Sequence, residues 1–234
     1  MNGITFNGKH SYNDFGLVLE EKKINPPAKT KILDTVPYMN SQYDFSTVGT
    51  NGEQVYGTRI ITVKLALLCY SMEQLYIVYS QVLEWLVDVG QSQLIFDFMP
   101  DFYFLAEVQE APSWDEFVDN GELSINFVCE PFKYSTSYMG DDLWDDINFL
   151  TDYMQDTNEF NISGSTTITM YNNGRLKAPV INCSSAMTVT FNNQTYNLVQ
   201  GDNKLWGLKL RNGKNDLVFS GNGTVKILFR WEML

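Results

Sequence analysis

The sequence predicts an α+β domain over residues 1–137 and an all-β sandwich over residues 160–234, joined by an acidic linker or short helix at residues 138–159. Three observations support this prediction. One helical pattern lies among alternating strand patterns in the first part, short strand patterns separated by turn residues fill the last part, and the net charge changes sign between them. A chain of 234 residues is long enough for two domains of ordinary size.

Charge is distributed unevenly along the chain, whose formal net charge is −12. Residues 1–137 carry a net charge of −10, residues 138–159 contain seven acids and no base, and residues 160–234 carry +5. An overall excess of acid argues against affinity for nucleic acid or for anionic lipid. No run of about 18 apolar residues occurs, so we expect no membrane insertion.

The predicted helix of the first domain follows Ser71. The sequence Ser71-Met-Glu-Gln74 fits a capping box, in which the serine hydroxyl accepts the amide hydrogen of Gln74. Apolar residues then recur at helical spacing as far as Leu86, and Gly90 suits the end of the helix. Together with strands predicted at 93–98, 102–109 and 122–130, this gives a sheet with one helix packed on it.

Two alternating runs, 43–47 and 60–67, flank a long polar loop that contains three glycines. Side chains of a strand alternate with period two, so both runs are predicted as strands. The loop is longer than a tight hairpin needs. The two runs and the loop would therefore form an extended ribbon, and the sequence pattern alone does not show what would use it.

The acidic segment 140–160 combines two helical features. Apolar residues fall at helical spacing, and acids fill the first turns, where they suit the positive end of a helix dipole. We expect a short amphipathic helix or an ordered linker. The apolar positions are Leu143, Ile147, Leu150 and Met154, and the acids are Asp141, Asp142, Asp145 and Asp146.

Beyond Ile162 the pattern consists of strands only, separated by turn residues such as Asn173-Gly174 and Gly221-Asn-Gly223. Asn-Gly supplies the positive φ angles that hairpin turns require. Seven short strands that follow one another at roughly 8–12 residues are typical of a β-sandwich. They are predicted at 166–171, 180–182, 187–191, 195–199, 205–210, 216–219 and 224–231.

The sequence contains no catalytic signature, so we expect no catalytic residue, no cofactor and no metal site. Its single histidine, His10, lies in a polar turn and is interpreted as a surface residue. No zinc motif, phosphate loop or nucleophile elbow occurs. Two carboxylates would suffice for glycoside hydrolysis, but the clustered acids are interpreted as solvated or turn residues: Asp97, Asp101, Asp141, Asp142, Asp145 and Asp146.

The three cysteines, Cys69, Cys129 and Cys183, are an odd number and lie in or beside apolar runs. We therefore predict reduced core residues and no redox or metal role.

A carbohydrate-binding module is the alternative to a purely structural role. Small sandwiches often bind sugars, and exposed aromatic rings stack on pyranose rings. A core position is nevertheless the preferred interpretation of each candidate, above all of Trp231 in an apolar strand. The candidate platform residues are Trp206 and Tyr196, with Tyr171 and Trp231 as further possibilities.

The order of these features resembles the distal tail protein (Dit) family of long-tailed, non-contractile phages. The resemblance spans essentially the whole chain. In the first part the matching segments are ITFNGKHSYNDFGLVLEE (4–21), YDFS (43–46), YGTRIITVKLAL (56–67) and INFVCEPFKY (125–134). In the second part they are MYNNGRLKAPVI (170–181) and LRNGKNDLVFSGNGTVKILFRW (210–231).

The resemblance implies a structural virion protein of the tail tip, assembled in the host bacterial cytoplasm, with no catalytic residue to carry over. Six copies would form a ring through their N-terminal domains, each with a hairpin that reaches onto the neighbouring subunit, and galectin-like sandwiches would project outward. The implied partners are the tail tube protein and a baseplate hub or tail fibre protein. DNA would only pass through the channel, which the charge predicts to be acidic. The expected inter-subunit belt residues are Tyr43, Asp44, Phe45, Arg59 and Ile61.

Some members of the family carry sugar-binding modules inserted in the C-terminal domain. This chain has no room for one, so direct receptor binding is not implied.

Overall fold

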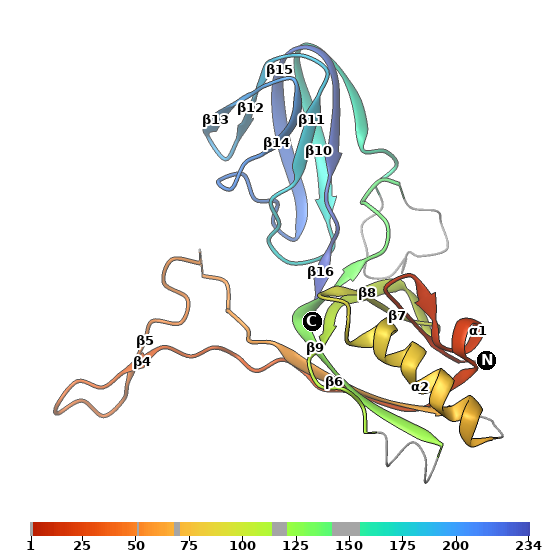
Figure 1. Ribbon diagram of the computed structural model, residues 1–234. Helices are drawn as coiled ribbons and strands as arrows, with labels where there is room; N and C mark the ends of the chain where they lie inside the picture. Colours follow the sequence, from red (N-terminus) through yellow and green to blue (C-terminus); the bar gives the residue numbers. More distant parts are fainter. Residues whose placement is uncertain (1, 51, 68–70, 114–120, 142–154) are drawn as a thin grey trace. The chain divides into compact units, whose positions relative to one another are not determined.

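The computed structural model describes residues 2–50, 52–67, 71–113, 121–141 and 155–234 (Figure 1). It divides into two compact units, Met1–Lys133 with Leu234, and Tyr134–Met233. Strands predominate, and both described helices belong to the first unit. No described helix is long and apolar enough to cross a membrane.

The first unit is built on one antiparallel sheet, with strand order β2-β1-β7-β8-β9-β6-β3. Its central strands alternate between buried and more exposed side chains, as the period of two requires. The strands are β1 (Ile4–Phe6), β2 (Lys9–His10), β3 (Leu17–Ile24), β6 (Arg59–Leu67), β7 (Ser92–Phe96), β8 (Met99–Val108) and β9 (Glu122–Ser135).

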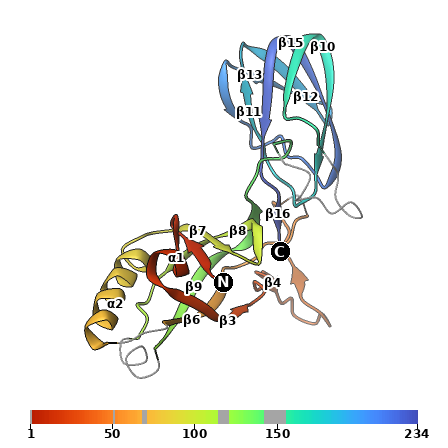
Figure 2. The same cartoon turned by 90° about the vertical axis from the view of Figure 1, so that its right-hand side faces the viewer.

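Helix α2 (Met72–Leu86) lies along one face of this sheet (Figures 1 and 2). The predicted cap is present, because the Ser71 hydroxyl accepts the Gln74 amide at 3.4 Å. The helix ends at Leu86 and not near Gly90. Leu86 is its last buried side chain, and Val87 and Asp88 beyond it are exposed, so no packing extends the helix further.

The core of the first unit lies between α2 and the sheet, with Trp85 as a large buried side chain. Its ring stacks on Phe15 at a centroid distance of 4.7 Å, and its Nε1 donates to the Phe6 carbonyl at 2.7 Å. Phe15 ends the short helix α1 (Ser11–Phe15), which Gly16 closes with φ = 70°. The indole therefore joins three elements and leaves no buried donor unpaired.

The chain between β3 and β6, residues 25–58, forms an arm that extends away from the sheet (Figure 1). Within it, β4 (Leu33–Asp34) pairs with β5 (Tyr43–Asp44), and Lys29 bridges to Tyr56 nearer its base. The predicted hairpin between 43–47 and 60–67 is therefore wrong in its pairing. Strand β6 has both edges occupied, by β3 and by β9, and has none left for β5.

Among its described residues the second unit contains strands only. Their order is β13-β12-β15-β11-β14, and β10 also pairs with β15. The short β16 (Glu232–Met233) pairs with β9, whose last two residues belong to this unit. The strands are β10 (Glu159–Asn172), β11 (Val180–Cys183), β12 (Met187–Phe191), β13 (Gln194–Leu198), β14 (Gly201–Lys204) and β15 (Gly213–Leu228).

Strand β15 is continuous where the sequence predicts a turn at Gly221-Asn-Gly223. It bends there instead, opposite Gly164 of β10, the cross-strand partner of Gly221. Residues 218–220 of β15 pair with β12, and residues 225–228 pair with β11. One long strand thus pairs first with β12 and then with β11, so the strands can pack on both sides of one core.

The predicted strand at 205–210 is also wrong, because the strand lies at Gly201–Lys204. The side chain of Asn203 is buried there, accepts the Val199 amide at 2.9 Å and donates to the Val199 carbonyl at 2.8 Å. Asn215 makes the same pair of bonds with Arg211, at 2.9 and 2.8 Å. Both asparagines replace backbone partners at the start of a strand.

The expected linker, residues 138–159, is not a separate segment at its described ends. Met139 is 2% exposed and belongs to the core of the second unit. Its amide donates to the Phe229 carbonyl at 3.0 Å, and the Asn158 carbonyl accepts the Ile227 amide at 2.9 Å. The helix expected from Leu143 to Met154 lies outside the described residues, and of the four acids expected in its first turns only Asp141 is described.

Candidate interaction surfaces

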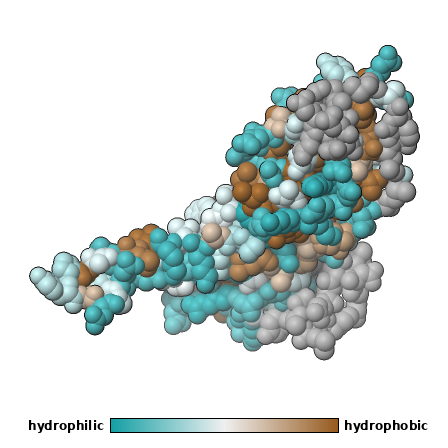
Figure 3. Space-filling model, turned by 90° about the horizontal axis from the view of Figure 1, so that it is seen from below, coloured by the Kyte–Doolittle hydropathy of each residue, from teal (hydrophilic) through white to brown (hydrophobic). Residues whose placement is uncertain are grey.

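The arm carries a concentration of exposed apolar side chains, and Figure 3 shows brown patches on it among white and teal surface. Eight of the 17 exposed large hydrophobic residues in the described chain lie on it. Exposed apolar surface gathered on one segment marks an interaction site more often than scattered residues do. The eight are Ile32, Leu33, Val36, Tyr38, Tyr43, Phe45, Val48 and Val55.

Polar contacts give the arm a defined conformation. The Nζ of Lys31 lies 2.6 Å from the Asp44 carboxylate, which also accepts the Ser46 amide at 2.9 Å. The Ser46 hydroxyl is buried and accepts the Ile32 amide at 2.9 Å. The hydrogen bond from Lys31, followed by those from Ser46, holds the pKa of Asp44 well below its usual range.

The structure separates the five predicted belt residues. Tyr43 and Phe45 are 52% and 43% exposed on the arm, with ring centroids 6.1 Å apart. The Asp44 carboxylate accepts hydrogen bonds from Lys31 and Ser46 within the arm. Arg59 and Ile61 belong to β6 and are buried, so Ile61 can offer no side chain to a neighbour. Belt contacts through Ile61 are therefore excluded by its packing in its own core.

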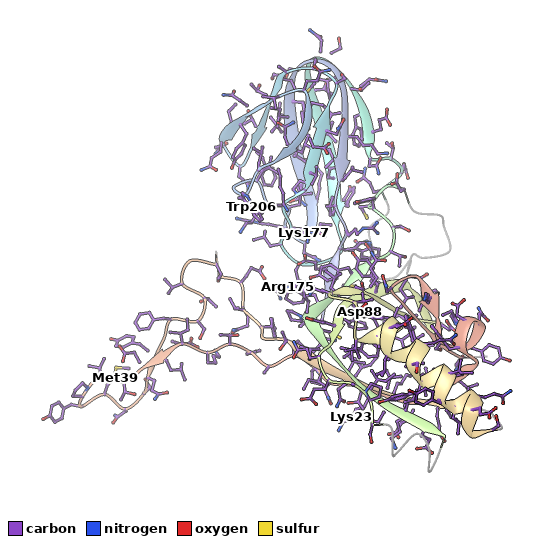
Figure 4. The ribbon with its side chains drawn as sticks, in the orientation of Figure 1. Lys23, Met39, Asp88, Arg175, Lys177 and Trp206 are labelled. Carbon is purple, nitrogen blue, oxygen red and sulfur yellow. The ribbon has the colours of Figure 1, made fainter. Side chains whose placement is uncertain are left out.

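Sequence reasoning missed the first half of the arm. Ile32, Leu33, Val36 and Tyr38 lie in a Pro- and Lys-containing stretch with no strand period, and of these four only Leu33 lies in the short strand that pairs with β5. Tyr38 is fully exposed, with φ = 69°, and the labelled Met39 beside it lies at the outer end of the arm (Figure 4). The only sequence signal for this half of the arm was its apolar residues, which follow neither a strand nor a helix period.

The four candidate sugar-stacking residues differ in exposure. Trp231 is 4% exposed and lies in the interior, as the core interpretation predicts. Tyr171 and Tyr196 are half-buried and pack against the core of the second unit. Trp206 is 71% exposed, at the edge of the unit, and Lys204 Nζ lies 4.7 Å from its ring centroid (Figure 4). A core position for Trp206 is therefore wrong.

The described residues contain no group of three side chains suited to holding a metal ion. Burial raises the pKa of the Cys129 thiol to about 12 and raises that of Cys183, so neither is an activated nucleophile. Both are free and buried, as predicted, whereas Cys69 lies outside the described residues. Asp141 accepts a hydrogen bond from Asn158 at 2.8 Å, and the other three clustered acids of 142–146 are not described.

Comparisons with known proteins give one match by sequence. A family model described as the phage tail protein RIFT-related domain matches residues 7–129, more than half of the chain. No curated protein matches.

Solved structures give a match over the full length. The crystal structure of SPP1 Dit (gp 19.1), described as a paradigm of the hub adsorption apparatus in phages that infect Gram-positive bacteria, has a TM-score of 0.64 and 11% identity, covering 100% of both chains. At that identity the likeness shows the fold alone. A chain of the phage p2 baseplate in its activated conformation with strontium has a TM-score of 0.39 at 11% identity and equal coverage, and carries no argument.

Proposed function

The chain belongs to the family of phage tail proteins with a RIFT-related domain, and we propose that six copies of it form a ring at the tail tip. Membership in this family indicates a structural role in the tail. The predicted resemblance to distal tail proteins is confirmed by the fold that the chain shares with SPP1 Dit. The proposed ring joins the tail tube protein to the baseplate hub or tail fibre protein. It is assembled in the host bacterial cytoplasm and remains in the virion.

The arm is the single observation that carries this proposal. Its eight exposed apolar side chains have no place in the core of the first unit, which is complete without them. Exposed apolar surface on an extended segment is stabilised when another chain covers it. A neighbouring copy is the proposed cover, with Tyr43 and Phe45 at the contact, because aromatic side chains are enriched where interfaces gain most of their energy.

The charge of the chain supports a channel through which DNA passes without binding. Residues 1–137 carry −10, so six copies bring about −60 to the ring. Acidic walls repel phosphates, although at about 0.1 M salt only acids within roughly 10 Å of the DNA contribute. A ring structure whose lumen is lined mainly by Lys and Arg would contradict this part of the proposal.

The test of the ring is removal of the arm. Lys29 and Tyr56 are cross-strand neighbours, so residues 30–55 can be replaced by Asn-Gly, which closes a two-residue hairpin. We expect this variant to remain folded and monomeric at concentrations where the full chain forms rings, measured by mass photometry and negative-stain microscopy. The control is Tyr76→Ser, which removes an exposed aromatic ring from α2, outside the arm. Rings that persist without the arm would exclude its proposed role.

Glycan binding through the second unit is the second candidate, favoured by the exposure of Trp206. An accessible indole can stack on a pyranose ring, and the neighbouring Lys204 favours an anionic glycan. The candidate predicts binding to cell-wall polysaccharide that Trp206→Ala abolishes and Tyr76→Ser leaves intact. Equal binding by wild type and Trp206→Ala, or none by either, would reject it.

A further inference from the structure

Arg59 is a buried cation at the first position of β6, where the arm joins the sheet. It is 5% exposed and shares the inward face of the strand with Ile61 and Val63. Arginine is among the residues least often buried without a paired acid. Its position at the root of the arm therefore calls for an explanation.

No group within the described chain neutralises this guanidinium. Its cross-strand neighbour is Cys129, a neutral thiol because burial raises its pKa to about 12, and the Sγ of that cysteine lies 3.6 Å from the Phe127 carbonyl. The Nε of Arg59 has no hydrogen-bond partner, and no described acid forms an ion pair with it.

The contact that Arg59 does make is weak compensation for its burial. Its Cζ lies 5.4 Å from the centroid of the Phe104 ring, at the outer part of the distance range for cation–π attraction. Burial also lowers the pKa of Arg59, which reflects the cost of holding the charge away from water. A buried charge that lacks a partner destabilises a folded chain, whereas the same charge with a well-placed carboxylate can stabilise an interface.

We propose that Arg59 receives a carboxylate carried by the arm of a second copy of this chain. This inference rests on the proposed ring, which brings the arm of one copy onto its neighbour. The chain has an excess of acids, yet none of the described ones pairs with Arg59 in its own copy. Guanidinium binds carboxylate through two parallel hydrogen bonds, which would also fix the position of the incoming arm.

Of the three acids on the arm, Asp34 is the one that we assign to this contact, since Glu53 is half-buried. It is exposed and lies opposite Tyr43 in the β4–β5 pair, and its carboxylate has no hydrogen-bond or ion-pair partner among the described residues. Asp44, its neighbour across the same pair, is already held by Lys31. The proposed ionic contact would thus lie beside Tyr43, one of the two exposed aromatic residues of the belt.

The proposal predicts effects of opposite sign on the monomer and on the assembly. In Arg59→Met the aliphatic packing on Phe104 is kept and the uncompensated charge is lost. Monomer stability, measured by urea unfolding below the concentration of assembly, should be unchanged or higher. The concentration at the midpoint of ring formation, measured by mass photometry, should rise about thirtyfold or more.

Charge exchange identifies the partner. Asp34→Arg and Arg59→Asp should each weaken assembly, and the double variant Asp34→Arg/Arg59→Asp should recover at least part of it. The matched control is Asp88→Asn, which removes an exposed acid on the segment after α2 and should leave the midpoint unchanged.

Three outcomes overturn the proposal. If the full chain forms rings that need the arm, and Arg59→Met forms them at the same concentration, Arg59 has no assembly role while the proposed function stands. If Arg59→Met lowers monomer stability, the residue is structural. If inorganic phosphate stabilises the wild-type monomer but not Arg59→Met, and Asp34→Asn assembles normally, the ligand is a free anion. Failure of the full chain to form rings at all would instead reject the proposed function.

Discussion

The Nε2 of His10 lies 3.1 Å from Oδ1 of Asp97, a contact between residues 87 positions apart. The Nδ1 atom accepts the backbone amides of Tyr12 and Asn13 at 3.1 and 3.2 Å, so the ring proton lies on Nε2 and is donated to Asp97. Neither nitrogen is left to take a proton from the neighbouring Ser11. A histidine beside an aspartate and a serine here caps a helix and does no nucleophilic chemistry.

The first prediction concerns this cap. His10→Ala should lower the free energy of unfolding by about 1–2 kcal/mol, because two amides of α1 and one oxygen of Asp97 lose their partner. His10→Asn keeps an acceptor at the cap and should recover part of the loss. Urea unfolding measures both, and equal stability of His10→Ala and wild type would show that the cap contributes nothing.

The second prediction concerns the bend in β15. A Cβ at Gly221, where φ is 152°, would lie 2.6 Å from the Cβ of Met187, so Gly221→Ala should cost about 2–4 kcal/mol of stability. The control is Gly164→Ala on the paired strand, where φ is 68° and no atom lies within 4 Å of the new Cβ. That variant should lose only about 1–2 kcal/mol from backbone strain. If the two variants unfold at the same temperature, the bend does not require glycine at position 221.

The third prediction is a pH dependence of the arm. Since the folded pKa of Asp44 is lowered, chiefly by Lys31, its ion pair contributes its full stability above about pH 4, the unfolded pKa. That contribution is lost as pH falls from there through the lower folded pKa, where the carboxylate is protonated and the contact breaks. Carboxyl ¹³C NMR should show Asp44 titrating below its usual range, and Lys31→Met should raise its pKa. An unchanged titration in Lys31→Met would show that the ion pair does not form in solution.

The fourth prediction concerns the boundary between the units. A fragment that begins at Tyr134 should unfold cooperatively, because it retains Met139 in the core and the 3.2 Å bond from the Ser135 amide to the Trp231 carbonyl. A fragment that begins at residue 160, where the sequence places the second domain, lacks both. It should be less stable by about 2–5 kcal/mol. Equal stability by thermal unfolding would favour the later boundary.

The sequence alone determined what depends on local periodicity. The alternation of β6 and β9, the cap at Ser71 and the all-strand character of the last third follow from side-chain spacing and turn residues near each other in the chain. It also determined the mostly apolar environment of Cys129 and Cys183, since their flanking residues alternate with the core. These features need no knowledge of distant neighbours.

Only the tertiary structure decided which edges and faces are used. The run at 43–47 pairs within the arm because β6 already has two partners, and Gly221-Asn-Gly223 bends a strand because β10 runs beside it without a break. Arg59 and Ile61 are two residues apart, so a strand places them on one face, but a period of two does not say whether that face meets the core or a neighbour. Packing settles that choice, because it depends on residues far away in the chain.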